Sequence, residues 1–274
     1  MNAQGGYFNR HVFFVARARY VGNSLITSST LRFMNQIFVP VTLGSQTFVL
    51  AHRGASRAER ENTVLAFRAA GDMGADGVEL DVRLTADRHL VVHHDPRLED
   101  GRDICALQHS EMPTHIPTLT EALDACSGMW VNVEIKNDEN EPDFDGSDSV
   151  AEVVVDALLA RKENSRFLIS SFRRETIDKV HEIAPELRTA WLTVAVVPND
   201  AENIIDGLVH GGHSALHPWV GVLTKELIDL CHARGIQVNT WTCDDEVRMA
   251  ELLAWKIDAI CTNVPDVALR VLGR

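Results

Sequence analysis

The sequence lacks the features that define several large classes of protein. No apolar run is long enough to span a bilayer, because stretches such as residues 12–16 are short and interrupted by arginine. The five cysteines include no C-x-x-C pair, so they indicate no zinc or redox motif. The sequence also has no cluster of lysine and arginine residues that would form a basic surface for nucleic acid. These absences argue against a transmembrane protein, a cysteine-based metal or redox protein and a nucleic-acid-binding protein.

Acidic residues are absent from residues 1–46 and abundant in the rest of the chain. The sequence has 26 basic and 39 acidic residues, and four of the basic residues, all arginines, lie in residues 1–46. Residues 47–274 therefore have 22 basic and 39 acidic residues, which gives a formal charge of −17. Such a surface repels phosphate backbones at long range. A small anionic substrate would therefore need local positive charge or a bound metal.

Residues 1–46 differ in kind from the rest and are predicted to form an N-terminal extension. An arginine-rich, acid-poor composition is typical of organellar presequences, so a targeting extension is one interpretation. The alternatives are that the sequence begins upstream of the true start, which would then be Met34, or that the segment is a loosely attached arm. The odd number and wide spacing of the cysteines fit a reducing compartment, and we expect a cytoplasmic protein. The sequence does not indicate an oligomeric state.

From residue 47 onward, short β-branched runs alternate with amphipathic segments, which is typical of βαβ units around a parallel sheet. Eight strands are predicted, at residues 48–53, 77–85, 130–136, 167–172, 188–194, 214–220, 236–243 and 257–263. Helices are predicted between them, among others at residues 63–73, 149–161, 173–183, 224–234 and 244–255. A doubly wound sheet would show the same alternation. Eight is the number of strands that closes a barrel, and the placement of the polar residues described below favours an α/β fold of the (β/α)8 TIM barrel type, formed by residues 47–274.

Two segments interrupt this alternation. Residues 89–95 form a short strand after the turn 86–88, and we interpret the two as a hairpin extension of the second barrel strand. Residues 96–117 lack periodicity and contain Gly101, Pro113 and Pro117, which predicts a short insertion over the mouth of the barrel.

Two carboxylates on the second strand are the firmest candidates for a site. Glu79 and Asp81 are two residues apart, so they point to the same side of a strand. The helix layer should cover the outer face, where the apolar residues Val78, Leu80 and Val82 fit, so both acids are expected inside the barrel. Two buried acids repel each other and lose hydration, which is costly unless a cation is bound.

A third carboxylate and two positive charges lie at the ends of other strands. Glu134 and Lys136 are also two residues apart, and the three acids together suit a hard ion such as Mg²⁺ or Ca²⁺. A simple neighbouring ion pair on an exposed edge is the alternative. His52 and Arg53 end the first strand before Gly54, and the planar fork of Arg53 suits a phosphate, as does the ammonium group of Lys136.

The pair His93-His94 follows the predicted extension strand. Neighbouring residues of a strand face opposite sides, so only one histidine should point into the site, and His94 is favoured because Asp95 and a turn at Pro96 follow it. At the end of the seventh strand, Trp241 is a candidate for lining a substrate or for packing in the core.

Taken together, these segments resemble the glycerophosphodiester phosphodiesterase family. The likeness runs from about residue 48 to the C-terminus and is carried by several motifs in one order: His-Arg-Gly at 52–54, Glu-Asn-Thr at 61–63, Gly-Val-Glu-Leu-Asp-Val at 77–82, Thr-Ala-Asp at 85–87, His-Asp at 94–95, Val-Glu-Ile-Lys at 133–136 and Thr-Trp-Thr at 240–242. Departures are Arg60 in place of a common proline, Asp244 in place of a common asparagine and Asn263 in place of the usual aspartate.

The resemblance implies a (β/α)8 barrel that hydrolyses glycerophosphodiesters to sn-glycerol 3-phosphate and an alcohol, in lipid and glycerol metabolism. It implies metal ligands at Glu79, Asp81 and Glu134, and a catalytic histidine pair at His52 and His94, with the acid and the base unassigned. Two alternatives stay open. One is a lysophospholipase D or sphingomyelinase D-like phosphodiesterase on the same barrel, and the other is a metal-binding barrel without turnover.

Overall fold

The computed structural model of the chain describes residues 46–274. The predicted extension, residues 1–46, therefore lies outside the described residues except for Gln46. Among the described residues, no helix has both the length and the apolar character needed to cross a membrane. All five cysteines are free, and four of them are buried, as expected of small core residues.

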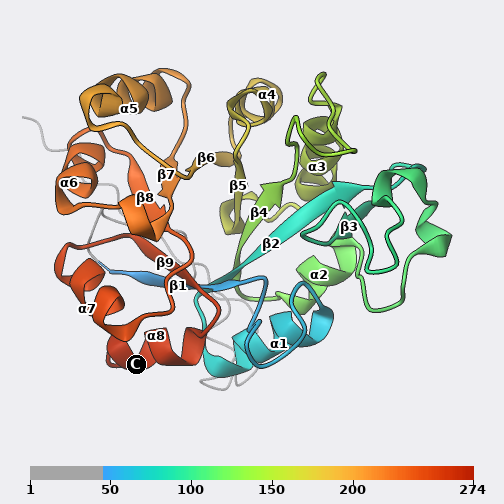
Figure 1. The fold of residues 1–274 in the computed structure, drawn as a ribbon, viewed down its shortest axis with the longest axis horizontal. Helices are drawn as coiled ribbons and strands as arrows, with labels where there is room; N and C mark the ends of the chain where they lie inside the picture. The colour runs from blue at the N-terminus through green and yellow to red at the C-terminus, as the bar shows by residue number, and fades with distance from the viewer. Residues whose placement is uncertain (1–45) are drawn as a thin grey trace, which may run out of the picture. The chain divides into compact units, whose positions relative to one another are not determined.

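The strands form a closed barrel, as predicted. Their bounds are β1 (Phe48–His52), β2 (Gly77–Leu84), β3 (Leu90–Val92), β4 (Trp130–Ile135), β5 (Phe167–Ser171), β6 (Arg188–Thr193), β7 (Ala215–Pro218), β8 (Gln237–Thr240) and β9 (Ala259–Thr262). Parallel pairing runs β1-β9-β8-β7-β6-β5-β4-β2, and a parallel pairing of β1 with β2 closes the ring. Figure 1 shows this inner ring of strands with helices around it.

Helices connect the strands on the outside of the barrel (Figure 1). Their bounds are α1 (Val64–Met73), α2 (Leu119–Ala125), α3 (Ser149–Ala160), α4 (Arg174–Ile183), α5 (Ala201–His210), α6 (Lys225–Ala233), α7 (Glu246–Ala254) and α8 (Pro265–Val271). α1 begins after Thr63, whose hydroxyl accepts a hydrogen bond from the amide of Ala66, and Gly74 ends it with a φ of 89°.

The predicted helix over residues 244–255 begins too early. α7 starts at Glu246, with Asp245 as its cap. Asp244 instead accepts hydrogen bonds from the loop that follows β9, because its carboxylate faces the donors of Thr262 and Asn263. This placement brings Asp244 to the edge of the site.

The alternation predicted for β2 is confirmed. Val78, Leu80 and Val82 are buried in the apolar cluster that also holds Phe67 of α1 and Leu123 of α2. The residues between them therefore face the interior of the barrel. The carboxyl ends of parallel barrel strands meet at one rim, which is where a site is expected.

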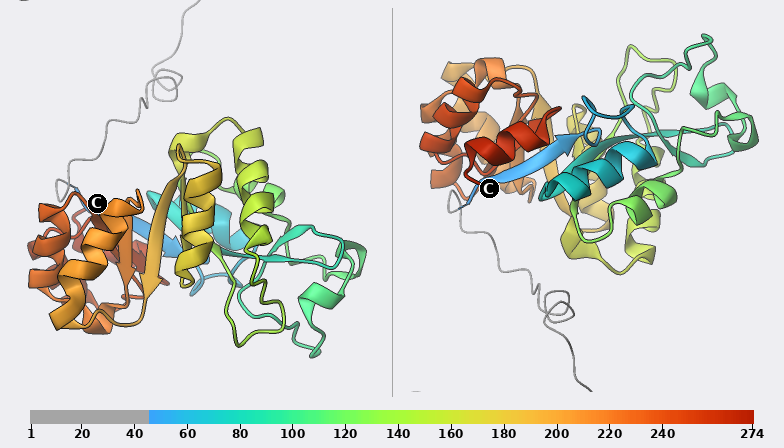
Figure 2. Two further views of the ribbon diagram at one scale, coloured as in Figure 1. Left: turned by 90° about the horizontal axis from the view of Figure 1, so that it is seen from above. Right: turned by 90° about the horizontal axis from the view of Figure 1, so that it is seen from below.

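The predicted hairpin is also confirmed, because β3 pairs antiparallel with β2. The insertion that follows contains two short 3-10 turns, Ile104–Ala106 and His109–Glu111, and its own apolar cluster around Ile104. The expected position over the barrel mouth is wrong: Figures 1 and 2 show this segment extending to the side of the ring of strands, beyond β3. Its small core anchors it to β3 through Val91 instead.

Candidate functional site

Three buried carboxylates meet inside the rim of the barrel. Glu79 and Asp81 come from β2, and Glu134 comes from the neighbouring β4, where it is in register with Asp81. The side chains offer ligand oxygens that all lie within 4.8 Å of one another. Their exposed fractions are only 4%, 1% and 7%. Strand alternation thus brings together the three acids that the sequence singled out.

Lys136 bridges two of these acids. Its Nζ lies 3.0 Å from Oδ1 of Asp81 and 2.6 Å from Oε1 of Glu134. Burial opposes the charge of this ammonium group, but the two carboxylates outweigh burial and raise its pKa. Lys136 therefore remains a cation inside the site, rather than forming the simple exposed pair that was the alternative.

Arg53 adds a second positive charge on a tight turn after β1. Its backbone has a φ of 56°, its amide donates to Oε2 of Glu79 at 3.0 Å, and its Nε lies 3.3 Å from Oδ2 of Asp81. The turn continues through Gly54, with a φ of 81°, where a Cβ atom would lie 2.6 Å from the carbonyl carbon of Ala66. Only glycine permits this close approach of the turn to α1.

Asn62 orients one of the acids from the loop before α1. Its backbone φ is 55°, and its Nδ2 donates to Oδ2 of Asp81 at 2.7 Å. Burial alone would raise the pKa of Asp81, but the charges of Lys136 and Arg53, with this hydrogen bond, lower it. Asp81 is thus held ionised.

Glu79 has the opposite electrostatic balance. Burial, followed by the charges of Asp81 and Glu134, raises the pKa of its carboxyl group. Its Oε1 is buried without a hydrogen-bond partner in the described part of the chain. Burial likewise raises the pKa of Glu134 in spite of Lys136. An oxygen-rich cluster with an unpartnered buried oxygen fits a hard divalent cation, which would offset the repulsion.

His52 is held at the end of β1 by a chain of hydrogen bonds. Its Nδ1 lies 2.7 Å from Oδ1 of Asn263, whose Nδ2 donates to Oδ2 of Asp244 at 2.7 Å. Its other ring nitrogen, Nε2, lies 4.0 Å from Oε2 of Glu79. Burial and the neighbouring Arg53 lower the pKa of His52. The ring is therefore fixed with one edge toward the carboxylate cluster.

His94 reaches the site from the segment that follows β3. Its Nδ1 lies 2.7 Å from Oδ1 of Asp95, and its backbone carbonyl accepts from Nε of Arg83 at 2.9 Å. Burial and the charge of Lys136 lower its pKa. The neighbouring His93 turns away, with its Nδ1 against the carbonyl oxygen of Asp95. Of the two, only His94 lines the cavity at the carboxylate cluster, as expected.

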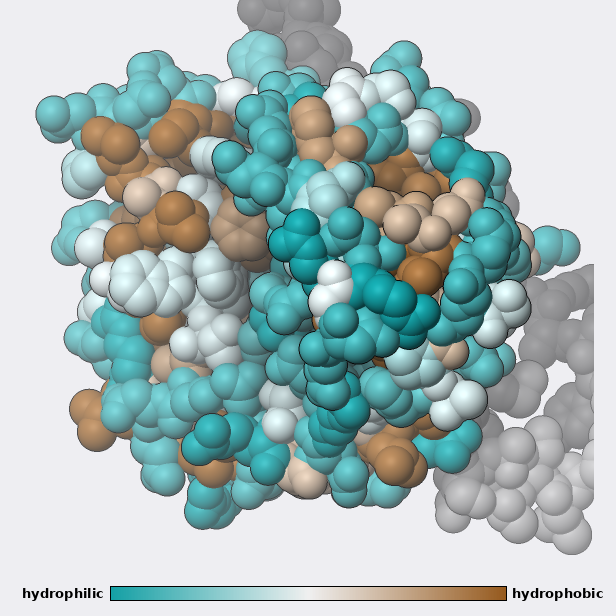
Figure 3. All heavy atoms as spheres, turned by 45° about the vertical axis from the view of Figure 1, so that its right-hand side comes forward, coloured by the Kyte–Doolittle hydropathy of each residue, from teal (hydrophilic) through white to brown (hydrophobic). Residues whose placement is uncertain are grey.

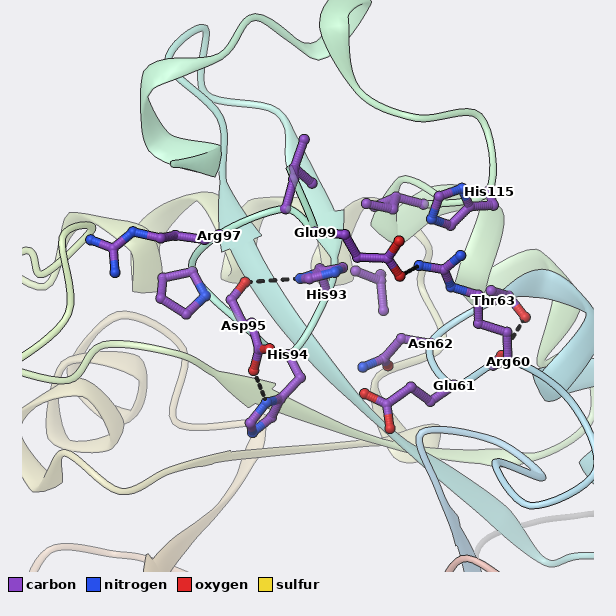
Figure 4. A pocket seen from close by; sticks show the side chains of 14 residues that line it. Arg60, Glu61, Asn62, Thr63, His93, His94, Asp95, Arg97, Glu99 and His115 are labelled. Atoms are coloured by element: carbon purple, nitrogen blue, oxygen red, sulfur yellow. Dashed lines mark hydrogen bonds and ion pairs between the residues drawn. The ribbon is translucent and has the colours of Figure 1, made fainter. Parts of the chain in front are cut away.

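Two cavities meet at His94. The inner one, of about 110 Å³, is lined by two of the carboxylates, Glu79 and Glu134, by both positive charges, and by Phe172, Trp241 and His217. The outer one, of about 520 Å³, lies between the loop before α1 and the insertion (Figure 4). Trp241 thus lines the inner cavity, and its indole Nε1 donates to the carbonyl of His217 at 2.8 Å.

Several residues at the site were not predicted from the sequence as members of it. Asn62 and Asn263 hold Asp81 and His52, and Arg83 holds His94. Asn62 lies in the recognised Glu-Asn-Thr motif, and Asn263 was noted as a departure, so both carried a signal. Arg83 carried none, because its partners come from distant loops.

Comparison with known proteins supports the same family. The glycerophosphoryl diester phosphodiesterase family profile matches residues 52–267. A glycerophosphodiester phosphodiesterase of Caldanaerobacter subterraneus subsp. tengcongensis is 29% identical over 256 residues, covering 84% of this chain and 99% of the relative.

Solved structures agree in fold. A phosphodiesterase of Oleispira antarctica, in complex with the product sn-glycerol-3-phosphate, aligns with a TM-score of 0.71 at 25% identity, covering 83% of this chain and 97% of that chain. A glycerophosphodiester phosphodiesterase of Thermotoga maritima aligns with a TM-score of 0.68 at 27% identity, covering 84% and 99%. The family resemblance and the enzyme class expected from the sequence are confirmed, and the chain belongs to the glycerophosphoryl diester phosphodiesterase family.

Proposed function

We propose that this protein hydrolyses glycerophosphodiesters to sn-glycerol 3-phosphate and an alcohol, with a divalent cation, Mg²⁺ or Ca²⁺, bound by Glu79, Asp81 and Glu134. The observation that carries the proposal is the buried cluster of three carboxylates within 4.8 Å, with His52 and His94 lining the same cavity as Glu79 and Glu134. The Oleispira antarctica phosphodiesterase with bound sn-glycerol-3-phosphate supports the choice of product.

The cation supplies charge neutralisation for the phosphodiester and for the charge that develops as the bond breaks. The donor set supports this, because Glu79 has a buried oxygen without a partner and carboxylates are the ligands that such ions prefer. Arg53 and Lys136 each form an ion pair with Asp81. In the proposal, these two cations bind the non-bridging phosphate oxygens.

The hydrogen bonds around His52 support its assignment as the base. Asp244 accepts from the side-chain nitrogen of Asn263, so the amide oxygen of Asn263 must face His52. An amide oxygen can only accept, so the proton of the neutral ring sits on Nδ1. Nε2, which faces the carboxylate cluster, keeps its lone pair and can take a proton from the attacking hydroxyl group.

His94 is left as the acid that protonates the departing alcohol. Its Nδ1 faces the carboxylate of Asp95, which partly offsets the burial and the charge of Lys136 that lower the pKa of the ring, and Nε2 points away from that partner. Glu79 and Glu134 cannot replace it as readily, because both are placed to bind the cation. In this proposal the two histidines divide the proton transfers between them.

The proposal is tested by measuring sn-glycerol 3-phosphate released from glycerophosphocholine in Mg²⁺ or Ca²⁺. We expect product with wild type, and a loss of at least about 100-fold in kcat for His52→Ala and for His94→Ala. Unchanged turnover in these variants would refute the histidine assignment. Product from lysophosphatidylcholine but none from glycerophosphocholine would favour a lysophospholipase D. No turnover of these two substrates or of any other glycerophosphodiester would favour a metal-binding barrel without catalysis.

A further inference from the structure

The outer cavity has no assigned ligand, although it is larger than the cavity that holds the carboxylates. It has a volume of about 520 Å³, against about 110 Å³ for the inner one. A volume of about 500 Å³ is within the range of small-molecule sites.

His94 lines both cavities and separates them. If His94 protonates the departing oxygen, that oxygen must lie beside the imidazole, and the rest of the alcohol must extend from there. The phosphate must lie in the inner cavity, because Glu79 and Glu134, two of the proposed ligands of the cation, line it. The outer cavity borders the same imidazole, and Figure 4 shows His94 and Asp95 on one side of it and Asn62 on the other.

The lining of the outer cavity is polar around a small apolar base. Val92, Leu98 and Ile116 provide the apolar part, and they are buried. Arg60 and Glu99 lie across from each other and are paired, with 2.5 Å between Nη2 and Oε1 (Figure 4). Figure 3 shows that hydrophilic residues dominate the centre of the face on this side of the molecule.

The lining contains both hydrogen-bond donors and acceptors. The guanidinium of Arg60 is a donor, and the carboxylates of Glu61 and Glu99 are acceptors. Nδ1 of His93 faces the carbonyl oxygen of Asp95 at 2.8 Å, so the neutral ring presents an acceptor at its other nitrogen. None of the described residues that line this cavity is Phe, Tyr or Trp. Such walls suit several hydroxyl groups better than a quaternary ammonium or an acyl chain.

We propose that the outer cavity binds the alcohol part of the substrate, and that this alcohol is a polyol. The inference rests on the proposed phosphodiesterase activity and specifies its substrate class. The polyol would place its hydroxyl groups against Arg60, Glu99 and His115, with its ester oxygen beside His94. A glycerophosphodiester of a cyclic or linear polyol is then the preferred substrate.

The test compares two diesters that share the glycerol phosphate and differ in the alcohol: sn-glycero-3-phosphoinositol and sn-glycero-3-phosphomethanol. His115 is exposed and lines the cavity, so His115→Trp narrows it without disturbing the core. Thr114→Trp, at an exposed neighbour outside the lining, is the matched control. We expect His115→Trp to lower kcat/KM for the inositol ester about tenfold, the effect of losing one or two hydrogen bonds. The methyl ester should change less than about twofold with either variant.

Three results would overturn the inference. One is an equal loss for both esters in His115→Trp, and another is no loss for either. The third is a wild-type enzyme that prefers sn-glycero-3-phosphocholine to the inositol ester. Failure of the wild type to hydrolyse any of the three esters would instead refute the proposed phosphodiesterase activity, and the polyol site with it.

Discussion

Replacing Arg83 by methionine is expected to destabilise the protein and to loosen His94. The Arg83 side chain is completely buried, and it joins two segments at the rim of the barrel. Its Nη1 lies 2.8 Å from Oε2 of Glu141 and 2.6 Å from Oδ2 of Asp143, in the loop after β4. Its Nε donates to the carbonyl of His94 at 2.9 Å.

The size of the effect follows from what the substitution leaves unpaired. Asp143 has a side-chain exposure of only 7%, so its carboxylate would lose a buried partner and gain little solvent. Removing one member of a buried ion pair costs about 3–5 kcal/mol. At about 2–4 °C per kcal/mol for a domain of this size, Tm should fall by about 6–20 °C.

The assay is thermal unfolding together with steady-state kinetics. Arg102→Met is the control, because Arg102 pairs with Asp100 at the surface, where such pairs contribute about 0–1 kcal/mol. Arg83→Met should also reduce kcat more than it changes KM, since it frees the backbone of the proposed acid. Adding Asp143→Asn should recover part of the lost stability, because it removes the stranded charge.

A Tm for Arg83→Met within about 3 °C of wild type, like that of the control, would refute the argument that this ion pair network holds the rim together. So would a further loss of stability on adding Asp143→Asn. A normal kcat in a destabilised Arg83→Met variant would show that His94 is positioned without it.

Three further outcomes are expected. ¹⁵N NMR should place the proton of neutral His52 on Nδ1. Asp244→Asn alone should mix the two tautomers and lower kcat, and adding Asn263→Asp should restore protonation at Nδ1. Unchanged spectra in these variants would contradict the assignment. Gly54→Ala should lower the free energy of unfolding by at least about 2 kcal/mol, because a Cβ atom there would meet backbone atoms at 2.6 Å. Gly101→Ala is the control: no atom lies within 4 Å of its Cβ position, so only its left-handed φ should matter, at about 1–2 kcal/mol. Burial lowers the pKa of His217 from 6.5 to about 3, so on acidification the unfolded state binds a proton at a higher pH than the folded state does. The free energy of unfolding should therefore fall as the pH drops from about 6.5 toward 3, by up to about 1.4 kcal/mol per pH unit. Denaturant titrations of His217→Gln should show a flatter slope in that window, and equal slopes would contradict the shift.

The part of the site that the sequence predicted is the part that strand periodicity determines. Glu79 and Asp81 lie two residues apart on a strand whose other face is apolar, so their direction follows from the pattern. Glu134 lies opposite Asp81 because β2 and β4 are neighbours in register, a pairing that an eight-stranded barrel requires.

The supporting residues depend on loops, and no local pattern specifies where loops go. Asn263 reaches His52 across 211 positions of the chain, and Arg83 reaches Asp143 across 60. The misplaced start of the helix at Asp244 has the same origin, since two adjacent aspartates were equally good caps. The insertion lacked periodicity, so its sideways packing on Val91 could not be read from the sequence.

The most direct test is to titrate the metal-free protein with Mg²⁺ or Ca²⁺ while following sn-glycerol 3-phosphate release, with Asp81→Asn beside wild type. If Glu79, Asp81 and Glu134 bind the cation, the metal-free protein should show no turnover, and activity should reach its maximum when one ion is bound per chain. Asp81→Asn should respond much more weakly to the added cation. Full activity of wild-type protein that retains far less than one bound metal ion per chain would contradict the metal-dependent account.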